Sequence, residues 1–179
     1  MKIMPKNWPP EYDAKFLPEH NSPFWDRKLE TMDPRERAET VILPKLQAQL
    51  HYAYRHSPFY RNKWDSAGVT PEDIQSLADF EKIPFVTKEE IREDQLKHPP
   101  FGSNLCISKD EIASVHGTSG TTGKPTAFGI SQGDMERIGE AHARIMWGFG
   151  IRPDDTVFIG SFFSLYLGSW GALAGVRRD

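Results

Sequence analysis

The sequence predicts an α/β fold, in which a helical N-terminal region leads into a mixed sheet with flanking helices. Several helix starts follow one another between residues 33 and 90. Two short apolar segments, 112–115 and 126–131, flank a loop of small residues. After the second segment, an amphipathic stretch is followed by the apolar run 156–159. A strand, a helix and another strand in this order are typical of an α/β layer.

Length and composition exclude several classes of protein. The 179 residues are enough for one hydrophobic core, and a formal net charge of −3 gives no field that would attract nucleic acid or an anionic membrane. No run of about 18 apolar residues occurs, which predicts no membrane span. Residues 1–10 lack the apolar core of a signal peptide, so we expect a cytoplasmic location. The single cysteine, Cys106, is expected to be a buried or half-buried apolar side chain.

Residues 1–32 are expected to form an extended arm. Prolines and aromatic residues occur there without a regular period. We expect the aromatic side chains to pack onto the body of the protein, and a subunit interface is the alternative. These residues are Trp8, Tyr12, Phe16, Phe24 and Trp25.

Residues 33–110 are expected to form a helical region. Asp33 can cap a helix, Pro34 suits its first position and Glu36 can complete a capping box. Pro44 should kink or restart this helix. Three more starts place a hydroxyl three residues before a carboxylate, so capping explains these acids without paired-carboxylate catalysis. They begin at Thr70, Ser76 and Thr87.

Residues 111–179 are expected to begin a nucleotide-binding α/β domain. Ser131 can cap a helix with Asp134 at its third position, and Gly148 or Gly150 should end it. The run Thr156–Ile159 predicts a buried parallel strand. The apolar stripe expected on the helix consists of Met135, Ile138, His142, Ile145, Met146 and Phe149.

The loop 116–126 is the most informative segment of the chain. It reads HGTSGTTGKPT. Glycines let successive N–H groups converge on an anion, hydroxyls add compact donors and the lysine adds a cation. A Walker A loop is excluded, because Thr118 stands where it needs glycine and Pro125 where it needs a hydroxyl. We predict a loop that binds the phosphates of a nucleoside triphosphate; a hydroxyl-rich hairpin without a ligand is the alternative. The predicted binding residues are Thr118, Ser119, Gly120, Thr121, Thr122, Gly123 and Lys124.

This strand–loop–strand segment resembles the phosphate loop of the adenylate-forming acyl- and aryl-CoA ligases, and within them the phenylacetate-CoA ligase group. Residues 56–61, HSPFYR, with AGV at 67–69, are similar to that group's PFYR and AGV segment. Residues 77–88 are similar to its LPFTTK segment. Glycines 168, 171 and 175 match the glycine-rich stretch after its loop. The likeness covers roughly residues 35–179, so we expect the N-terminal portion of such a ligase.

The resemblance implies that a carboxylate attacks the α-phosphorus of ATP to give an acyl-adenylate and pyrophosphate, and that the thiol of CoA then displaces AMP. ATP, Mg²⁺ and CoA are therefore implied, with a small aromatic carboxylic acid as substrate. The resemblance also implies that residues between 160 and 175 wall the acid pocket, and a glycine-containing core helix is the alternative. Phe163 stands where relatives tend to carry tyrosine, and Trp170 stands where a smaller residue is common. These differences leave the identity of the acid substrate open. The implied wall residues are Phe163, Tyr166, Trp170 and Gly171.

The family's segments for adenine, for ribose and for the C-terminal lysine do not occur in the 179 residues. The adenine and CoA sites would then lie outside this chain, no catalytic or metal-ligating residue is assigned, and we expect the isolated polypeptide not to form the acyl-adenylate. Three hypotheses stay open. The chain is the N-terminal part of an aryl-CoA ligase, completed by a C-terminal part or a second polypeptide; a non-catalytic interaction module; or an adenylating enzyme for another acceptor, such as a deazaflavin cofactor. A homo-oligomer is also open.

Overall fold

The computed structural model describes residues 7–13, 15–118 and 125–177. The chain divides into two compact units, each assembled from separate stretches of sequence. The residues of strand β2, Ala127–Ser131, are divided between the two units. Unit 1 comprises Met1–Pro9, Asp33–Asp110 and Thr126–Phe128, and unit 2 comprises Pro10–Met32, Glu111–Pro125 and Gly129–Asp179.

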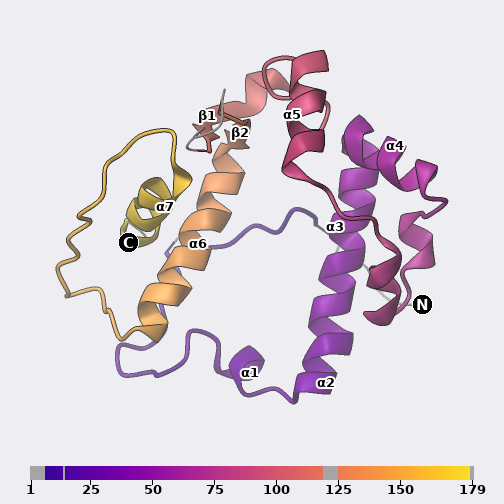
Figure 1. Ribbon diagram of the computed structural model, residues 1–179. Coiled ribbons are helices and arrows are strands. Elements are labelled where there is room, and N and C mark those ends of the chain that lie inside the picture. The colour runs from indigo at the N-terminus through magenta and orange to yellow at the C-terminus, as the bar shows by residue number, and fades with distance from the viewer. Residues whose placement is uncertain (1–6, 14, 119–124, 178–179) are drawn as a thin grey trace. The chain divides into compact units, whose positions relative to one another are not determined.

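Unit 1 is helical, and its longest helix is α3 (Figure 1). Asp33 caps the first helix by accepting hydrogen bonds from the N–H groups of Arg35 and Glu36, as predicted. Pro44 has no N–H to donate one turn back, and a π-helical turn precedes the helix that contains it, so the predicted restart is confirmed. The helices are α2 Pro34–Arg37, α3 Leu43–His56, α4 Pro58–Ser66 and α5 Lys88–Lys97, with a π-helical turn at Ala38–Ile42 and 3₁₀ turns at Pro71–Asp73, Ala78–Lys82 and Lys109–Glu111.

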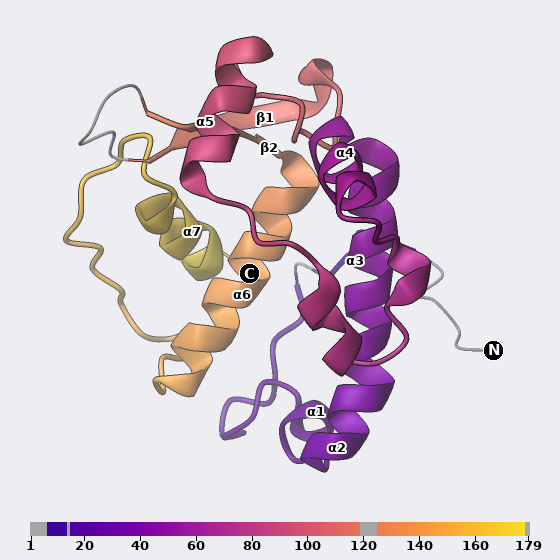
Figure 2. The ribbon, with the colours of Figure 1, turned by 45° about the vertical axis from the view of Figure 1, so that its right-hand side comes forward.

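The predicted helix starts after residue 70 form in unit 1. Thr70 and Thr87 each form a reciprocal capping box with the acid three residues later. The carboxylate of Asp79 accepts hydrogen bonds from both the N–H and the hydroxyl of Ser76. These acids are therefore occupied at helix ends, as expected. The core of the unit lies between α3 and α4, which run side by side in Figure 2, and consists of Leu50, Ala53, Trp64 and Ile74.

Unit 2 packs helix α7 against helix α6, and the two lie side by side in both views (Figures 1 and 2). Strands β1 and β2 pair as a small antiparallel sheet. Among the described residues, no helix has the length and apolar character needed to cross a bilayer. The elements are α1 Arg27–Glu30, β1 Ile112–Gly117, β2 Ala127–Ser131, α6 Gln132–Gly148 and α7 Leu167–Val176.

The buried face of α6 differs from the predicted apolar stripe. Ile145 and Phe149 are 54% and 81% exposed, although both belonged to the stripe. Ala143 and Trp147 are buried instead, in one cluster with Trp25. The indole of Trp25, brought from the segment before residue 33, and helix α7 together cover this side of α6. That segment is not extended throughout, because it contains the one-turn helix α1.

The predicted parallel strand at 156–159 does not form. Its backbone has no strand assignment, and Phe158 is 91% exposed. Among the described residues, β1 and β2 are the strands that pair, and neither lies beside this run. A strand needs a neighbour to take up its backbone hydrogen bonds, so an apolar run without one stays irregular.

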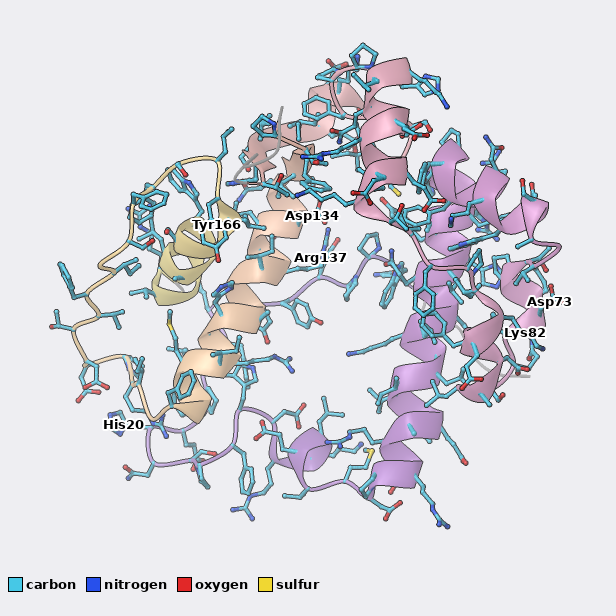
Figure 3. The ribbon with its side chains drawn as sticks, viewed as in Figure 1. His20, Asp73, Lys82, Asp134, Arg137 and Tyr166 are labelled. Carbon is cyan, nitrogen blue, oxygen red and sulfur yellow. The ribbon has the colours of Figure 1, made fainter. Side chains whose placement is uncertain are left out.

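The start of α6 is confirmed as a capping box. Ser131 and Asp134 bond reciprocally, and Arg137 donates to the other oxygen of the Asp134 carboxylate at 2.8 Å (Figure 3). Burial raises the pKa of Asp134, but hydrogen bonds from Arg137 and Ser131 outweigh it, so the pKa lies below its ordinary value. A carboxyl whose pKa is lowered by folding contributes its full stabilisation at pH values above its pKa in the unfolded state. That contribution disappears as the pH falls through its pKa in the folded state.

Replacing Asp134 by alanine is therefore expected to lower the free energy of unfolding by about 1 kcal/mol at pH 7, through loss of the cap. The difference from wild type should shrink below about pH 4, where the wild-type carboxyl becomes protonated. Urea unfolding at several pH values measures both. Glu136→Ala, an exposed acid in the same turn, is the control and should be near neutral. An Asp134→Ala effect that is independent of pH would contradict this account.

Candidate functional site

Strand β1 leads directly to the predicted phosphate loop. Side chains alternate along it, so Ser114 and His116 share one face, and the hydroxyl of Ser114 lies 3.1 Å from Nε2 of His116. His116 is only 5% exposed. Its Nδ1 is buried without a hydrogen-bond partner among the described residues. Burying a nitrogen without a hydrogen bond costs about 1–3 kcal/mol of stability. A hydrogen bond with a polar group outside those residues would remove that cost.

The predicted phosphate-binding residues fall mostly outside the described part of the chain. Thr118 is described and is half-buried after the end of β1. The others, Ser119, Gly120, Thr121, Thr122, Gly123 and Lys124, lie outside the described residues.

The start of the predicted loop is joined to the predicted pocket wall within unit 2. The N–H of Gly117 donates to the carbonyl of Leu165 at 2.8 Å. The His116 ring lies edge-on to Trp170, with ring centroids 6.5 Å apart. Trp170 in turn packs edge-to-face on Phe163 at 5.0 Å, and its indole N–H donates to the carbonyl of Ser164 at 2.8 Å. The structure therefore brings together the end of β1 and two of the predicted wall residues.

Tyr166 and Gly171 lie differently from these two. Tyr166, labelled in Figure 3, is 58% exposed, and its ring lies against Gly168, where an added Cβ would come within 2.4 Å of it. Gly171 is buried on the side of α7 that faces α6. A Cβ there would come within 2.4 Å of the His142 ring. The glycine thus lets α7 approach α6 closely, and His142 is fixed by its Nδ1 contact with the Ile138 carbonyl at 2.9 Å.

The end of the predicted loop lies in unit 1. Thr126 is 2% exposed, and the next residue, Ala127, forms two hydrogen bonds with the side chain of Gln95 on α5. Sequence reasoning did not assign Gln95, His116 or Ser164 to a site. Period-2 alternation in β1 could have indicated that His116 is buried, but no local pattern indicates the contacts of Gln95.

The chemistry available at the described wall is apolar and hydrogen-bonding rather than acidic. Residues 112–118 and 163–171 contain no Asp or Glu. Among the residues that the structure describes, no three His, Cys, Asp or Glu side chains gather as they would around a metal ion. The described wall therefore does not fit a Mg²⁺ site of its own. It offers aromatic surface for an apolar group, beside a loop whose sequence suits an anion.

Comparison with known proteins identifies the family. No family model matches the chain. Phenylacetate-coenzyme A ligases match it: that of Escherichia coli (strain K12) is 35% identical over 152 residues, and that of Thermus thermophilus is 36% identical over 154. These matches cover 82% and 86% of this chain but 34% and 33% of the relatives. A 2-hydroxyisobutyryl-CoA ligase crystallised with 2-HIB-AMP and CoA is 54% identical, with a TM-score of 0.91, over 96% of this chain and 36% of that one.

The chain corresponds to an N-terminal portion of the adenylate-forming CoA ligases. It spans about a third of the length of the relatives it matches. The family resemblance and the fold class predicted from sequence are thereby confirmed.

Proposed function

We propose that this chain carries the phosphate-binding loop and part of the acid-binding wall of an ATP-dependent acyl-CoA ligase that acts on a small 2-hydroxy acid. The observation that carries the proposal is the 54% identity, over 96% of the chain, to a ligase whose complex holds 2-HIB-AMP and CoA. The phenylacetate-CoA ligases are only 35% and 36% identical.

The composition of the wall supports a small acid. Phe163 and Trp170 pack edge-to-face at 5.0 Å, and the Trp170 indole is oriented by its bond to Ser164. Two aromatic side chains packed on each other in this way would leave less room for a phenyl ring than a smaller residue at 170 would. A branched acid of a few carbons needs no such room. A 2-hydroxyl group also needs a polar partner, and buried His116 lies beside Trp170.

In the proposed reaction, an oxygen of the acid attacks the α-phosphorus of ATP, and the bond to the β-phosphate breaks. Residues 118–124 would hold the leaving pyrophosphate, with amides and hydroxyls donating to its oxygens and Lys124 adding charge. Donors fixed in advance are effective because they need no reorganisation as charge develops. Mg²⁺ would share the charge of the phosphates when bound. The contacts to adenine and CoA would come from the two thirds of the relatives that this chain does not span.

Activation of an arylacetic acid is the second candidate. It is favoured by four curated relatives, all of them phenylacetate-coenzyme A ligases that match more than four fifths of this chain.

A pair of chimeric ligases tests the proposal. Residues 1–179 replace the corresponding third of the 2-hydroxyisobutyryl-CoA ligase and, separately, of a phenylacetate-coenzyme A ligase. ATP–pyrophosphate exchange is then measured with 2-hydroxyisobutyrate and with phenylacetate. We expect the first chimera to favour 2-hydroxyisobutyrate, and the second to gain activity toward it relative to its parent. Lys124→Ala should slow exchange with both acids, because the loop contacts phosphate and not the acid. A preference for phenylacetate in both chimeras would establish the second candidate instead.

A further inference from the structure

The amide of the Gln95 side chain forms two hydrogen bonds with the backbone of Ala127, one to its carbonyl and one from its N–H. Its Nε2 donates to the carbonyl of Ala127 at 2.6 Å, and its Oε1 accepts from the N–H of Ala127 at 3.2 Å. A neighbouring β-strand makes the same pair of bonds to a residue. Ala127 is the first residue of β2 and directly follows Thr126, the last residue of the predicted phosphate loop. Thr126 itself is 2% exposed.

Helix α5, which carries Gln95, is held in unit 1 by a second set of polar contacts. The adjacent Asp94 is 8% exposed, and its two oxygens accept from the N–H and the hydroxyl of Ser103, both at 2.6 Å. The carbonyl of Ser103 accepts from the hydroxyl of Ser57, the fully buried N-cap of α4. Hydrogen bonds thus connect the α3–α4 junction, through Ser103, to the helix that binds Ala127.

The turn before Ser103 lies close to the Asp94 carboxylate. Gly102 has a φ of +79°, and a Cβ there would come within 2.4 Å of an Asp94 carboxylate oxygen. Glycine is therefore required both by the backbone conformation and by the close approach to Asp94. A second, longer bond from Nε2 of Gln95 reaches the carbonyl of Phe101 at 3.4 Å. The amide of Gln95 consequently has little freedom to move away from Ala127.

We propose that Gln95 is a positioning residue for the phosphate loop: by fixing the peptide groups of Ala127, it sets where the loop ends. This inference rests on the proposed function of the loop. A phosphate loop is effective only when its amides and hydroxyls are held in place before the ligand arrives, and a small displacement is costly. Gln95 does not touch the phosphates in this account. It acts through the backbone of Ala127.

Amide hydrogen exchange and pyrophosphate binding, both measured on the 179-residue chain, test the proposal. Gln95→Leu removes both bonds. It should speed exchange of the Ala127 N–H and weaken pyrophosphate binding, each by about tenfold. Glu93→Gln, an exposed substitution on the same helix, is the matched control and should change neither. Circular dichroism and the urea midpoint report whether each variant is folded.

Gln95→Glu adds a readout that a merely structural role would not give. Its carboxylate can accept from the Ala127 N–H but repels the Ala127 carbonyl, whereas the protonated acid can make both bonds, as the amide does. Ala127 protection and pyrophosphate affinity, each relative to wild type at the same pH, should therefore recover as the pH is lowered from 8 to about 4, through the ordinary range of a glutamic acid. If Gln95→Leu matches the control while wild type binds pyrophosphate, the positioning role is wrong and the proposed function stands. If wild type binds no pyrophosphate, both are overturned.

Discussion

Replacing Trp147 by alanine is expected to lower the free energy of unfolding by about 3–5 kcal/mol. The indole is 4% exposed and packs edge-to-face on Trp25 at 5.8 Å. Its N–H donates to the carbonyl of Ser22 at 2.9 Å, and the guanidinium of Arg152 lies 4.0 Å from its ring centroid. Alanine would leave a cavity in the buried cluster of unit 2 and would remove the polar contact and the cation–π contact together.

Phe149→Ala is the matched control, because it deletes an aromatic side chain two residues further along. Phe149 is 81% exposed, so its loss should change the free energy of unfolding by less than about 0.5 kcal/mol. Urea unfolding followed by tryptophan fluorescence and by circular dichroism gives both values. Similar losses for the two variants would mean that the predicted stripe, and not the observed buried face, is the packed side of α6.

Replacing Trp170 by glycine is expected to shift acid preference toward phenylacetate by about 10²-fold. In the proposed wall, the indole lies beside Phe163 and His116, at centroid distances of 5.0 and 6.5 Å. Glycine would remove the indole and leave room for a phenyl ring, which a small 2-hydroxy acid does not need. The ratio of kcat/KM for the two acids should therefore change mainly through a gain for phenylacetate.

The measurement is pyrophosphate exchange by the 2-hydroxyisobutyryl-CoA ligase chimera that carries residues 1–179. Phe162→Ala serves as the control, since Phe162 is 75% exposed in the same segment and should leave the ratio unchanged. An equal fall of kcat/KM for both acids in Trp170→Gly would show that Trp170 supports the fold without selecting the acid.

Local patterns predicted the features of this chain that depend on neighbouring residues. The caps at Asp33, Thr70, Thr87 and Ser131 formed as expected, because a short polar side chain bonds the helix end. At the last three, the acid three residues later bonds the same end. The position of Pro44 predicted an interruption for the same local reason. The family resemblance also came from local segments, and the comparisons confirmed it.

Features that depend on distant partners could not be predicted in this way. The run at 156–159 has the composition of a buried strand, but composition cannot supply the neighbouring strand that it would need. The predicted stripe on α6 did not include Ala143 and Trp147, because their partner Trp25 lies more than 100 residues earlier in the chain. The assignment of acid-pocket residues stays a prediction.

The sequence by itself determined the helix caps, the Pro44 interruption and the family, because each is encoded in short local segments. Only the tertiary structure decided which side of α6 is buried, that Gly117 bonds to Leu165, and that Gln95 binds Ala127. Gln95 and Ala127 are 32 positions apart, and no periodicity links them. Their contact exists because α5 is fixed by its own buried hydrogen bonds, and such bonds form only once the chain has folded.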